Sequence, residues 1–505
     1  MRLDLAMLAS LLSGRRLRPR LRMAVMAFAG VCAAASPSLA ESGPGTARPG
    51  ACVERAKATS EPTRPLTPGE RRLILQTVQN GDEQTEAPPT TVDDATLVAT
   101  VLRYAQTELG QRIRPSRVDR IWAVEPATHD VAAELQQAQA SGRLAEWLAN
   151  ISPPHAGYRR LRAERCRYLL IVDAGGWAPI PAGATLREGD ESPIVAQLRL
   201  RLALQDLATA TSQRPNRFDG DVSRALKLFQ QRNGLLVDGG LGTGTREVLN
   251  ISAEARLGQI EANLERWRWL PHILPDRRIE VDIAGEVATL FEAGRPSLEM
   301  RVVVGDRRHK TPMFATQVEG IVFNPPWNVP ASIAANELLP REAREPGYLE
   351  RNGFERRAGR LIQRAGPNNA LGRLKFEFPS PFSVYLHDTP ARAVFARPRR
   401  DLSHGCVRLE KPVELARALL AAQSWTPAMI DDAVAAGTTR RVAIKATIPL
   451  YFVYRTAVVD DTGALNFRPD IYSWDTKLLS ALAPASARSL DEVRLESECS
   501  ASSSH

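Results

Sequence analysis

The sequence predicts a multidomain α + β protein with a helical N-terminal region, a compact three-helix module, and a mostly-β C-terminal region that carries a helical insertion. Its 505 residues exceed what one hydrophobic core normally organises, so several domains are expected. In the first half, apolar residues recur every three or four positions, which indicates helices. In the second half, short runs alternate apolar and polar residues between glycine-bearing turns, which indicates strands.

The composition is ordinary for a globular protein, with 44% apolar and 24% charged residues. The formal net charge is +9, and residues 1–40 contain six Arg and one Asp, so the rest of the chain carries about +4. This mild balance does not favour nucleic acid as a partner, and no basic run with interleaved aromatic residues supports one.

Residues 1–40 have the pattern of an export signal. Five arginines between residues 15 and 22 precede an apolar run at 23–35, and Ser38-Leu39-Ala40 supplies the small residues that a signal peptidase needs. The apolar run is short for a membrane span. We therefore expect a cleaved signal peptide and an exported protein, with an uncleaved membrane anchor as the alternative.

The five cysteines are spread along the chain and form no CxxC pair, so neither a zinc site nor a redox motif is predicted, and no metal or cofactor is expected. Cys52 and Cys499 lie in polar segments near the chain ends, and export would place them in an oxidising compartment. We predict that these two form a disulfide, with Cys166 as the rival partner.

The chain divides into segments of different character. Residues 41–65 are rich in Gly, Pro, Ser and Thr, which is typical of a linker. A mixed-charge helical stretch at 331–372 interrupts the β-rich region and is either a solvated helical face or a lid over a cleft. The predicted boundaries are 66–182 for the helical scaffold, 183–250 for the three-helix module, 251–276 for a connecting helix, 277–450 for the β-rich domain, and 451–505 for a closing segment and tail.

The stretch from Ser403 to Arg408, Ser-His-Gly-Cys-Val-Arg, contains candidate catalytic residues. A thiol attacks as the thiolate, so Cys406 needs a base or a positive field nearby. His387 ends an apparent strand nineteen residues earlier and can meet Cys406 across adjacent strands. Gly405 permits a tight turn, whose backbone amides could face a developing oxyanion. Arg408 adds positive charge that suits a thiolate and substrate carboxylates.

Each of these residues also has a structural interpretation. A single cysteine is commonly a small buried hydrophobe, His404 could simply brace the turn, and Arg408 could pair with Glu410 or Asp401. The order His then Cys disfavours papain-like and amidase enzymes. A sortase-like enzyme would place its arginine farther downstream than Arg408 lies. A catalytically inactive wall-binding adaptor is the alternative from another functional class.

His387 together with Ser403-His404-Gly405-Cys406-Val407-Arg408 resembles the signature of the L,D-transpeptidase catalytic domain. The three-helix module resembles the peptidoglycan-binding module found beside wall enzymes, and its glycine-rich turn at 238–245 is part of that pattern. The order of scaffold, wall-binding module and catalytic domain with a lid resembles the large Gram-negative members. The resemblance implies a periplasmic location. If the signal segment is not cleaved, it would anchor the protein in the inner membrane.

This resemblance implies a function and roles for individual residues. Cys406 would form a thioester with a stem peptide and release D-Ala, His387 would take the thiol proton, and the turn formed by Ser403, His404 and Gly405 would support an oxyanion together with Arg408. The product would be a 3→3 cross-link between stem peptides. An L,D-carboxypeptidase or a lipoprotein-attaching enzyme would use the same chemistry with another acceptor.

The resemblance also implies partners and a substrate cleft. Peptidoglycan stem peptides and glycan strands would be the substrates, and cell-wall synthesis enzymes would be partners. Tyr385, Trp327 and Asn328 would line the donor site, although each also fits a packing role. Members of the family are acylated by carbapenems, so the same is expected of this chain.

Overall fold

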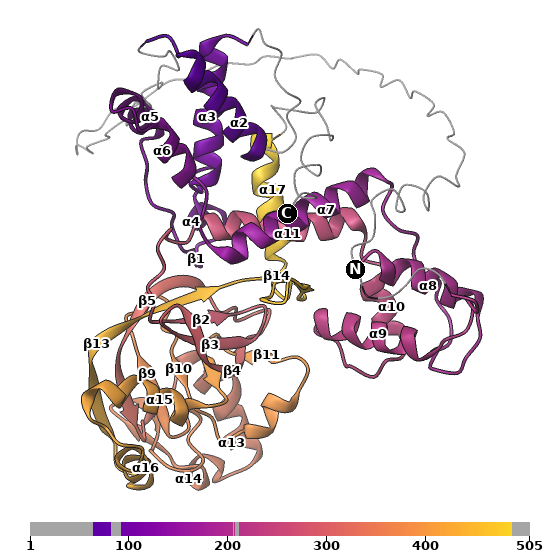
Figure 1. Ribbon diagram of the computed structural model, residues 1–505. Coiled ribbons are helices and arrows are strands. Elements are labelled where there is room, and N and C mark those ends of the chain that lie inside the picture. The colour runs from indigo at the N-terminus through magenta and orange to yellow at the C-terminus, as the bar shows by residue number, and fades with distance from the viewer. Residues whose placement is uncertain (1–63, 82–91, 206, 208–211, 487–505) are drawn as a thin grey trace, which may run out of the picture. The chain divides into compact units, whose positions relative to one another are not determined.

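The computed structural model describes residues 64–81, 92–205, 207 and 212–486 (Figure 1). The predicted signal peptide, most of the predicted linker, and both Cys52 and Cys499 lie outside the described residues, so the predicted disulfide stays a prediction. Helices occupy the N-terminal half and a large sheet occupies the C-terminal half, which confirms the predicted multidomain α + β organisation. None of the helices in the described part is both long and apolar enough to cross a membrane.

The first helical cluster is held by its own apolar core. Val101 and Ala105 on one helix face Ile74 on another, and all three are fully buried. Asp93 and Asp130 accept hydrogen bonds from backbone N–H groups in the first turns of their helices, which fixes where these helices begin. The helices of residues 66–182 are α2 (Pro68–Gly81), α3 (Asp94–Glu108), α4 (Pro115–Val118), α5 (Val131–Ala140), α6 (Leu144–Asn150) and α7 (Ala156–Asp173).

The predicted three-helix module has a separate core and comprises α8 (Pro193–Ala203), α9 (Gly220–Arg232) and α10 (Thr243–Leu249). Its glycine-rich turn wraps around the side chain of Gln230. That buried amide accepts from the backbone N–H of Gly239 at 2.8 Å and donates to the carbonyl of Gly240 at 3.1 Å. Gly239 has a φ of +71°, and an added Cβ would lie 2.8 Å from the side chain of Lys227, so this position in the turn favours glycine.

The C-terminal sheet closes on itself. Its strand order runs β1-β5-β13-β2-β3-β4-β12-β10-β9, and an added pairing of β9 with β5 joins the two sides. Its strands are β1 (Trp122–Ala123), β2 (Arg278–Asp282), β3 (Val287–Glu292), β4 (Arg295–Gly305), β5 (Met313–Phe323), β9 (Leu374–Glu377), β10 (Leu386–His387), β11 (Asp401–Ser403, on β4), β12 (Val407–Leu409) and β13 (Arg440–Val453). The helices α15 (Pro412–Leu420) and α16 (Pro427–Ala435) bury apolar residues in the same core.

Two features of this sheet were not predicted. β1 belongs to the segment expected to be purely helical, yet it pairs in parallel with β5, and Trp122 is fully buried in the core of the sheet. β13 runs through residue 450, where the β-rich domain was expected to end, and continues to Val453. The chain then forms a small hairpin of β14 (Ala457–Val459) and β15 (Leu465–Phe467) and the helix α17 (Trp474–Ser486).

The insertion at 331–372 is helical only in its first half. Short helical turns cover Ala331–Ile333, Ala334–Leu338, Leu339–Arg344 and Tyr348–Arg351. A hairpin of β7 (Phe354–Arg357) and β8 (Arg360–Gln363) follows, and β6 (Trp327–Asn328) adds a third strand. The sequence did not predict this hairpin, because its two strands are short and half of their residues are charged.

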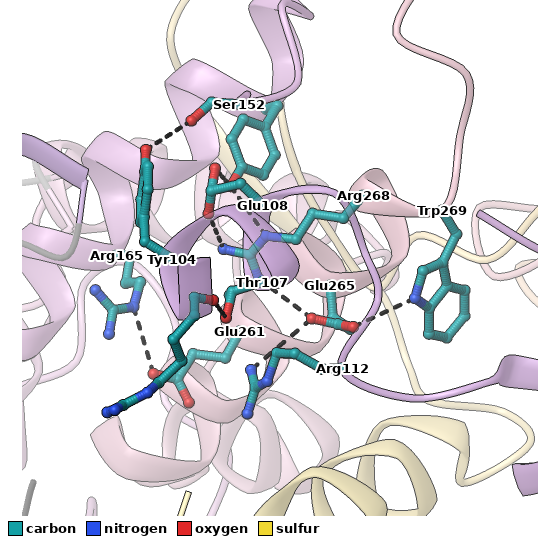
Figure 2. Close-up of polar contacts among 12 residues, drawn as sticks. Tyr104, Thr107, Glu108, Arg112, Ser152, Arg165, Glu261, Glu265, Arg268 and Trp269 are labelled. Atoms are coloured by element: carbon teal, nitrogen blue, oxygen red, sulfur yellow. Dashed lines mark hydrogen bonds and ion pairs between the residues drawn. The ribbon is translucent and has the colours of Figure 1, made fainter. Parts of the chain in front are cut away.

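The connecting helix α11 (Ala253–Arg268) joins the helical regions to the sheet domain. Arg268 lies at its C-terminal end and donates to Glu108 of α3 at 2.7 Å and to Glu265 at 3.2 Å (Figure 2). The Glu108 carboxylate also accepts from the hydroxyl of Tyr158 at 2.7 Å. Burial acts to raise the pKa of Glu108, but Arg268 and Arg162 outweigh it and the pKa is lowered. The pair is therefore ionised in the interior.

Nearer its N-terminal end, α11 makes polar contacts with other parts of the chain. Arg256 donates to Asn233 at the end of α9 at 2.9 Å. Asn263 donates to the hydroxyl of Thr456, which follows β13, at 2.7 Å and accepts the backbone N–H of the same residue at 2.9 Å. Because most of these partners are buried, α11 is held by specific hydrogen bonds in addition to apolar packing.

Replacing Glu108 with Gln should lower the free energy of unfolding by about 3 kcal/mol, because it leaves the buried Arg268 with less compensating charge. A urea titration followed by tryptophan fluorescence would measure this change. The matched control is Asp221→Asn, which breaks an exposed pair with Arg224 and should change stability by no more than about 0.5 kcal/mol. Equal urea midpoints for the two variants would show that the buried pair contributes no more to stability than the exposed pair.

Candidate active site

The candidate site is built on two short strands that run parallel. β10 pairs with β12 with His387 opposite Arg408, and the backbone N–H of Val407 donates to the carbonyl of Tyr385 at 3.0 Å. Side chains alternate between the two faces of a strand, so Tyr385 and His387 share one face with Cys406 and Arg408. The intervening residue on each strand is fully buried in the core. The structure therefore brings the predicted cysteine and histidine to the same face of neighbouring strands.

His387 is buried and oriented by its own backbone neighbour. Its Nδ1 lies 2.6 Å from the carbonyl oxygen of Asp388. A carbonyl only accepts, so Nδ1 carries the proton and Nε2 is left unprotonated. Burial lowers the pKa of His387 to about 3, with Arg408 and Lys375 acting in the same direction. The imidazole is thus neutral and can accept a proton at neutral pH.

Cys406 is half-buried immediately before β12 and forms no disulfide. Burial raises the pKa of its thiol, while the backbone amide of Tyr385 and the charges of Arg408 and Lys375 act to lower it. With a neutral imidazole beside it, the resting pair is a thiol and an imidazole rather than an ion pair. Proton transfer to His387 then accompanies attack on a substrate.

The turn before Cys406 is held by internal hydrogen bonds. The hydroxyl of Ser403 donates to the carbonyl of Cys406 at 2.5 Å and accepts the backbone N–H of Gly405 at 3.1 Å. Gly405 has a φ of +104°, a conformation that favours glycine. Its carbonyl accepts the hydroxyl of Thr311 at 2.9 Å, and the backbone N–H of Thr311 donates to the hydroxyl of Tyr472 at 3.2 Å.

These bonds correct one expectation about the oxyanion. The amide of Gly405 was expected to face a developing negative charge, but it already donates to Ser403. The reason is the tight turn, whose nearest acceptor is the serine hydroxyl two residues earlier. The backbone amides of His404 and Cys406 are the remaining candidates in this turn, and Ser403 supports the turn rather than the oxyanion directly.

His404 points away from this turn toward the insertion. Its Nε2 lies 2.8 Å from Oε1 of Glu337, which belongs to the insertion, and its ring is 4.6 Å from that of His309. The His404 side chain is 38% exposed and that of Glu337 is 49% exposed, so this contact is accessible to solvent. It links the insertion directly to the residue two positions before Cys406.

The three residues predicted to line the donor site have different surroundings. Tyr385 immediately precedes β10 and lies beside Cys406, and its ring is 4.6 Å from Nζ of Lys375. Trp327 and Asn328 form β6 in the small sheet of the insertion, where the Trp327 ring is 6.3 Å from that of Phe354. No contact within the described part connects these two residues with Cys406. Tyr385 alone is therefore brought next to the predicted pair.

Sequence reasoning did not single out Lys375 or Glu337 as site residues. Lys375 on β9 is the pairing partner of His387 on the side opposite Arg408. The alternation in Leu374-Lys375-Phe376, where two buried residues flank a charged one, is typical of a strand and could have indicated this position. The strand itself was not recognised in the sequence. No sequence pattern distinguishes Glu337, because its segment is rich in both acidic and basic residues and any of several glutamates there could face the turn.

Comparison with known protein families assigns the domains. Residues 63–164 match a family described as "Scaffold domain", and residues 191–249 match one described as "Putative peptidoglycan binding domain". Residues 276–442 match the L,D-transpeptidase catalytic domain. The chain carries an L,D-transpeptidase catalytic domain. It follows a scaffold domain and a peptidoglycan-binding domain in the order that the sequence resemblance implied, and the Cys406–His387 face lies within it.

Individual relatives agree with this assignment. A protein of Haemophilus influenzae named "Putative L,D-transpeptidase" is 31% identical over 248 residues, which is 45% of this chain and 50% of the relative. The chain thus spans half the length of that relative. L,D-transpeptidases of known structure from Xylanimonas cellulosilytica and Mycobacterium smegmatis are each 15% identical, with TM-scores of 0.18 and 0.19. They cover 54% and 35% of this chain and 98% and 58% of their own, and TM-scores this low add no argument.

The rate of acylation of Cys406 should be nearly constant from about pH 8 down to about pH 5, because the folded pKa of His387 is about 3. A histidine with an ordinary pKa of about 6.5 would lose half its base form at about pH 6.5 and nearly all of it by about pH 5. As pH falls, loss of activity should begin only below about pH 4. Stopped-flow measurement of kcat/KM against pH, with fluorescence to verify folding, tests this. A midpoint between pH 6 and 7 would contradict the burial argument.

Proposed function

We propose that the protein is a peptidoglycan L,D-transpeptidase that forms 3→3 cross-links between stem peptides through a thioester on Cys406. The observation that carries the proposal is the parallel pairing of β10 with β12, which gives Cys406 and His387 a common face within an L,D-transpeptidase catalytic domain. A thiol beside a neutral, oriented imidazole suits acyl transfer by nucleophilic catalysis.

In the first half-reaction, the thiol of Cys406 gives its proton to Nε2 of His387 as the sulfur attacks the carbonyl carbon of the third stem residue. The amide of Cys406 stabilises the resulting oxyanion. The C–N bond to the terminal D-Ala then breaks, and the imidazolium donates its proton to the leaving amine. The products of this step are free D-Ala and a thioester between Cys406 and the shortened stem.

In the second half-reaction, the side-chain amine of the diamino acid on a neighbouring stem attacks the thioester carbonyl. His387 accepts the proton that this amine loses and returns it to the departing sulfur. A new amide bond joins the two third residues, and the thiol of Cys406 is regenerated. Water or another amine in place of the stem amine would give carboxypeptidase activity or attachment of a protein through the same intermediate.

The domain content supports peptidoglycan as the substrate, since a peptidoglycan-binding domain precedes the catalytic domain. We also propose that the protein works in the periplasm, because residues 1–40 have the pattern of an export signal. In that compartment, cell-wall synthesis enzymes would supply the stem peptides on which it acts.

Purified protein incubated with peptidoglycan fragments that carry tetrapeptide stems should produce 3→3 linked dimers and one D-Ala for each new bond. Mass spectrometry of the muropeptides measures both products. Cys406→Ala should lose at least a thousandfold in rate because no thioester can form. Cross-linked dimers made by Cys406→Ala at the wild-type rate would exclude Cys406 as the nucleophile, whereas release of D-Ala without dimers would identify water as the acceptor.

A carbapenem should add one covalent equivalent to the protein at Cys406, because its strained lactam presents a carbonyl to the activated thiol. Intact-mass measurement should show that the adduct is absent in Cys406→Ala and forms at least a hundredfold more slowly in His387→Ala. Cys166→Ala is the matched control and should be acylated like the wild type. An adduct that persists without Cys406 would count against both the mechanism and the site.

A further inference from the structure

Two arginines of the helical regions are buried away from any carboxylate. Arg201 on α8 and Arg256 on α11 are each 2% exposed. Arg201 donates through Nε to the carbonyl of Leu249 at 3.2 Å, and Arg256 donates to the side-chain oxygen of Asn233 at 2.9 Å. Both terminal nitrogens of Arg201 are buried without a hydrogen-bond partner. Within the described part of the chain, the hydrogen bonds of both arginines therefore go only to uncharged oxygens.

Both guanidinium groups stay charged at neutral pH. Burial lowers the pKa of Arg201 to about 9 and that of Arg256 to about 10, so both values remain above pH 7. Arg256 and Arg167 also act to lower the pKa of Arg201, because the three positive charges lie within electrostatic reach of one another. The guanidinium carbon of Arg201 lies 3.6 Å from the centroid of the Trp177 ring, which offers a cation–π contact but no negative charge.

Several other buried arginines of the chain are neutralised by carboxylates. Arg278 contacts Glu280 and Arg268 contacts Glu108, each at 2.7 Å. Burying a charge without a compensating partner costs free energy. A place in the fold that keeps two such charges close together is therefore expected to meet an anion from outside the chain.

A cavity of about 140 Å³ opens beside these arginines. It is bounded by α7, by the C-terminal ends of α8 and α9, and by the hairpin of β14 and β15. One water needs roughly 10–15 Å³ of such space, so the cavity has room for a ligand of about ten heavy atoms. The side chains that line it include those of Arg167, Tyr168, Gln205, Arg232, Asn233 and Phe467.

Tyr168 connects the wall of the cavity with the buried arginines. Its hydroxyl accepts a hydrogen bond from Gln205 at 3.0 Å, so it keeps its own proton for another acceptor. Its ring packs edge-on against that of Phe467 at 5.9 Å between centroids, and the guanidinium carbon of Arg256 lies 4.2 Å from the centroid of the Phe467 ring. Tyr168 also acts on the pKa of both Arg201 and Arg256, so both arginines lie close behind this aromatic wall.

Two more arginines add positive charge around the cavity. Arg232, at the end of α9, is half-buried in the lining and donates to the carbonyl of Gln205 at 3.5 Å. Arg468, which follows β15, donates to the carbonyl of Arg232 at 3.0 Å. Among the described residues that line the cavity, Glu164 supplies the carboxylate, and it pairs with Arg167 at 2.6 Å. The cavity therefore combines hydrogen-bond donors with an excess of positive charge.

We propose that this cavity binds an oxyanion group, a phosphate or a carboxylate, carried by a small polar ligand. Arg232 and the hydroxyl of Tyr168 donate hydrogen bonds to the anion, and the positive field of Arg201, Arg256 and Arg468 attracts it. The bound anion supplies the negative charge that the buried arginines lack. The site uses no residue of β10 or β12 and goes beyond the proposed transpeptidase function.

The position of the cavity gives the ligand a structural effect. α7 belongs to the scaffold region, α8 and α9 belong to the peptidoglycan-binding domain, and β14 and β15 follow the catalytic domain. A ligand that contacts all three favours the state in which they are assembled, by an amount that grows with its concentration. An anion bound there therefore reinforces the junction between these parts of the chain.

Isothermal titration calorimetry of the purified protein at constant ionic strength measures the binding of three probes. Inorganic phosphate and N-acetylmuramic acid carry the two kinds of oxyanion, and N-acetylglucosamine is the neutral sugar matched to the second. At least one of the anions should bind at a single site with a dissociation constant of about 1 mM or below. N-acetylglucosamine should bind at least about tenfold more weakly than that anion. A preference for phosphate or for N-acetylmuramic acid then identifies the source of the oxyanion.

Substitutions in the cavity separate this site from a general attraction to positive charge. Arg232→Gln should weaken anion binding at least about tenfold, because it removes a charged donor from the lining. Arg224→Gln is the matched control, since it removes the same charge from the same helix at an exposed pair with Asp221, and it should bind like the wild type. Tyr168→Phe removes only a hydroxyl and should weaken binding by about threefold to tenfold. Cys406→Ala, which disables the proposed transpeptidase chemistry, should bind the anion like the wild type.

Failure of both anions to bind the folded wild type would overturn the site. Equal weakening by Arg232→Gln and Arg224→Gln would also overturn it, since that pattern means attraction to the net charge of the surface. N-acetylglucosamine that binds as tightly as the anions would show that the cavity does not recognise an oxyanion. Thermal unfolding without ligand establishes that each variant is folded. If Arg232→Gln does not fold, Tyr168→Phe and Arg232→Lys, which should lose affinity by a smaller factor, decide the matter.

Discussion

The parallel pairing of β10 with β12 is the constraint on which the site depends. Each strand is only two or three residues long, yet the register between them decides which side chains meet. Leu386 and Val407 are both fully buried, so hydrophobic burial fixes the register. A slip by one residue would turn His387 and Cys406 into the core and expose the leucine and valine. The geometry of the candidate site is therefore maintained by the apolar residues beside it.

The charge arrangement follows from the same register. Burial lowers the pKa of His387, and the cations that the strands on both sides of β10 place opposite it act in the same direction, so the imidazole stays neutral. For the thiol of Cys406 the two effects oppose each other, because burial raises its pKa and the two cations act to lower it. The site thus keeps the sulfur protonated until it attacks, and it resists positive charge on the imidazole.

The sequence predicted the parts of the protein that depend on local pattern or on a motif. His387 and the turn that carries Cys406 were singled out because the motif around Cys406 is contiguous, and the domain order followed from the resemblance to a known family. Lys375 was missed because its strand was not recognised, and β1 was missed because a two-residue strand within helical sequence has no periodicity of its own. The bond from Gly405 to Ser403 depends on φ and hydroxyl direction, which no residue pattern specifies.

The path of β13 through the sheet has a consequence for how the protein is made. Leu450 pairs in parallel with Ile279 and in antiparallel with Thr316, so this strand fills the space between β2 and β5. Both of those strands leave the ribosome long before their common neighbour is synthesised. Until then they present unpaired apolar edges, and contacts so distant in sequence form slowly. Closure of the sheet must therefore wait until β13 has been synthesised, and a chain truncated before residue 440 cannot assemble the candidate site on a closed sheet.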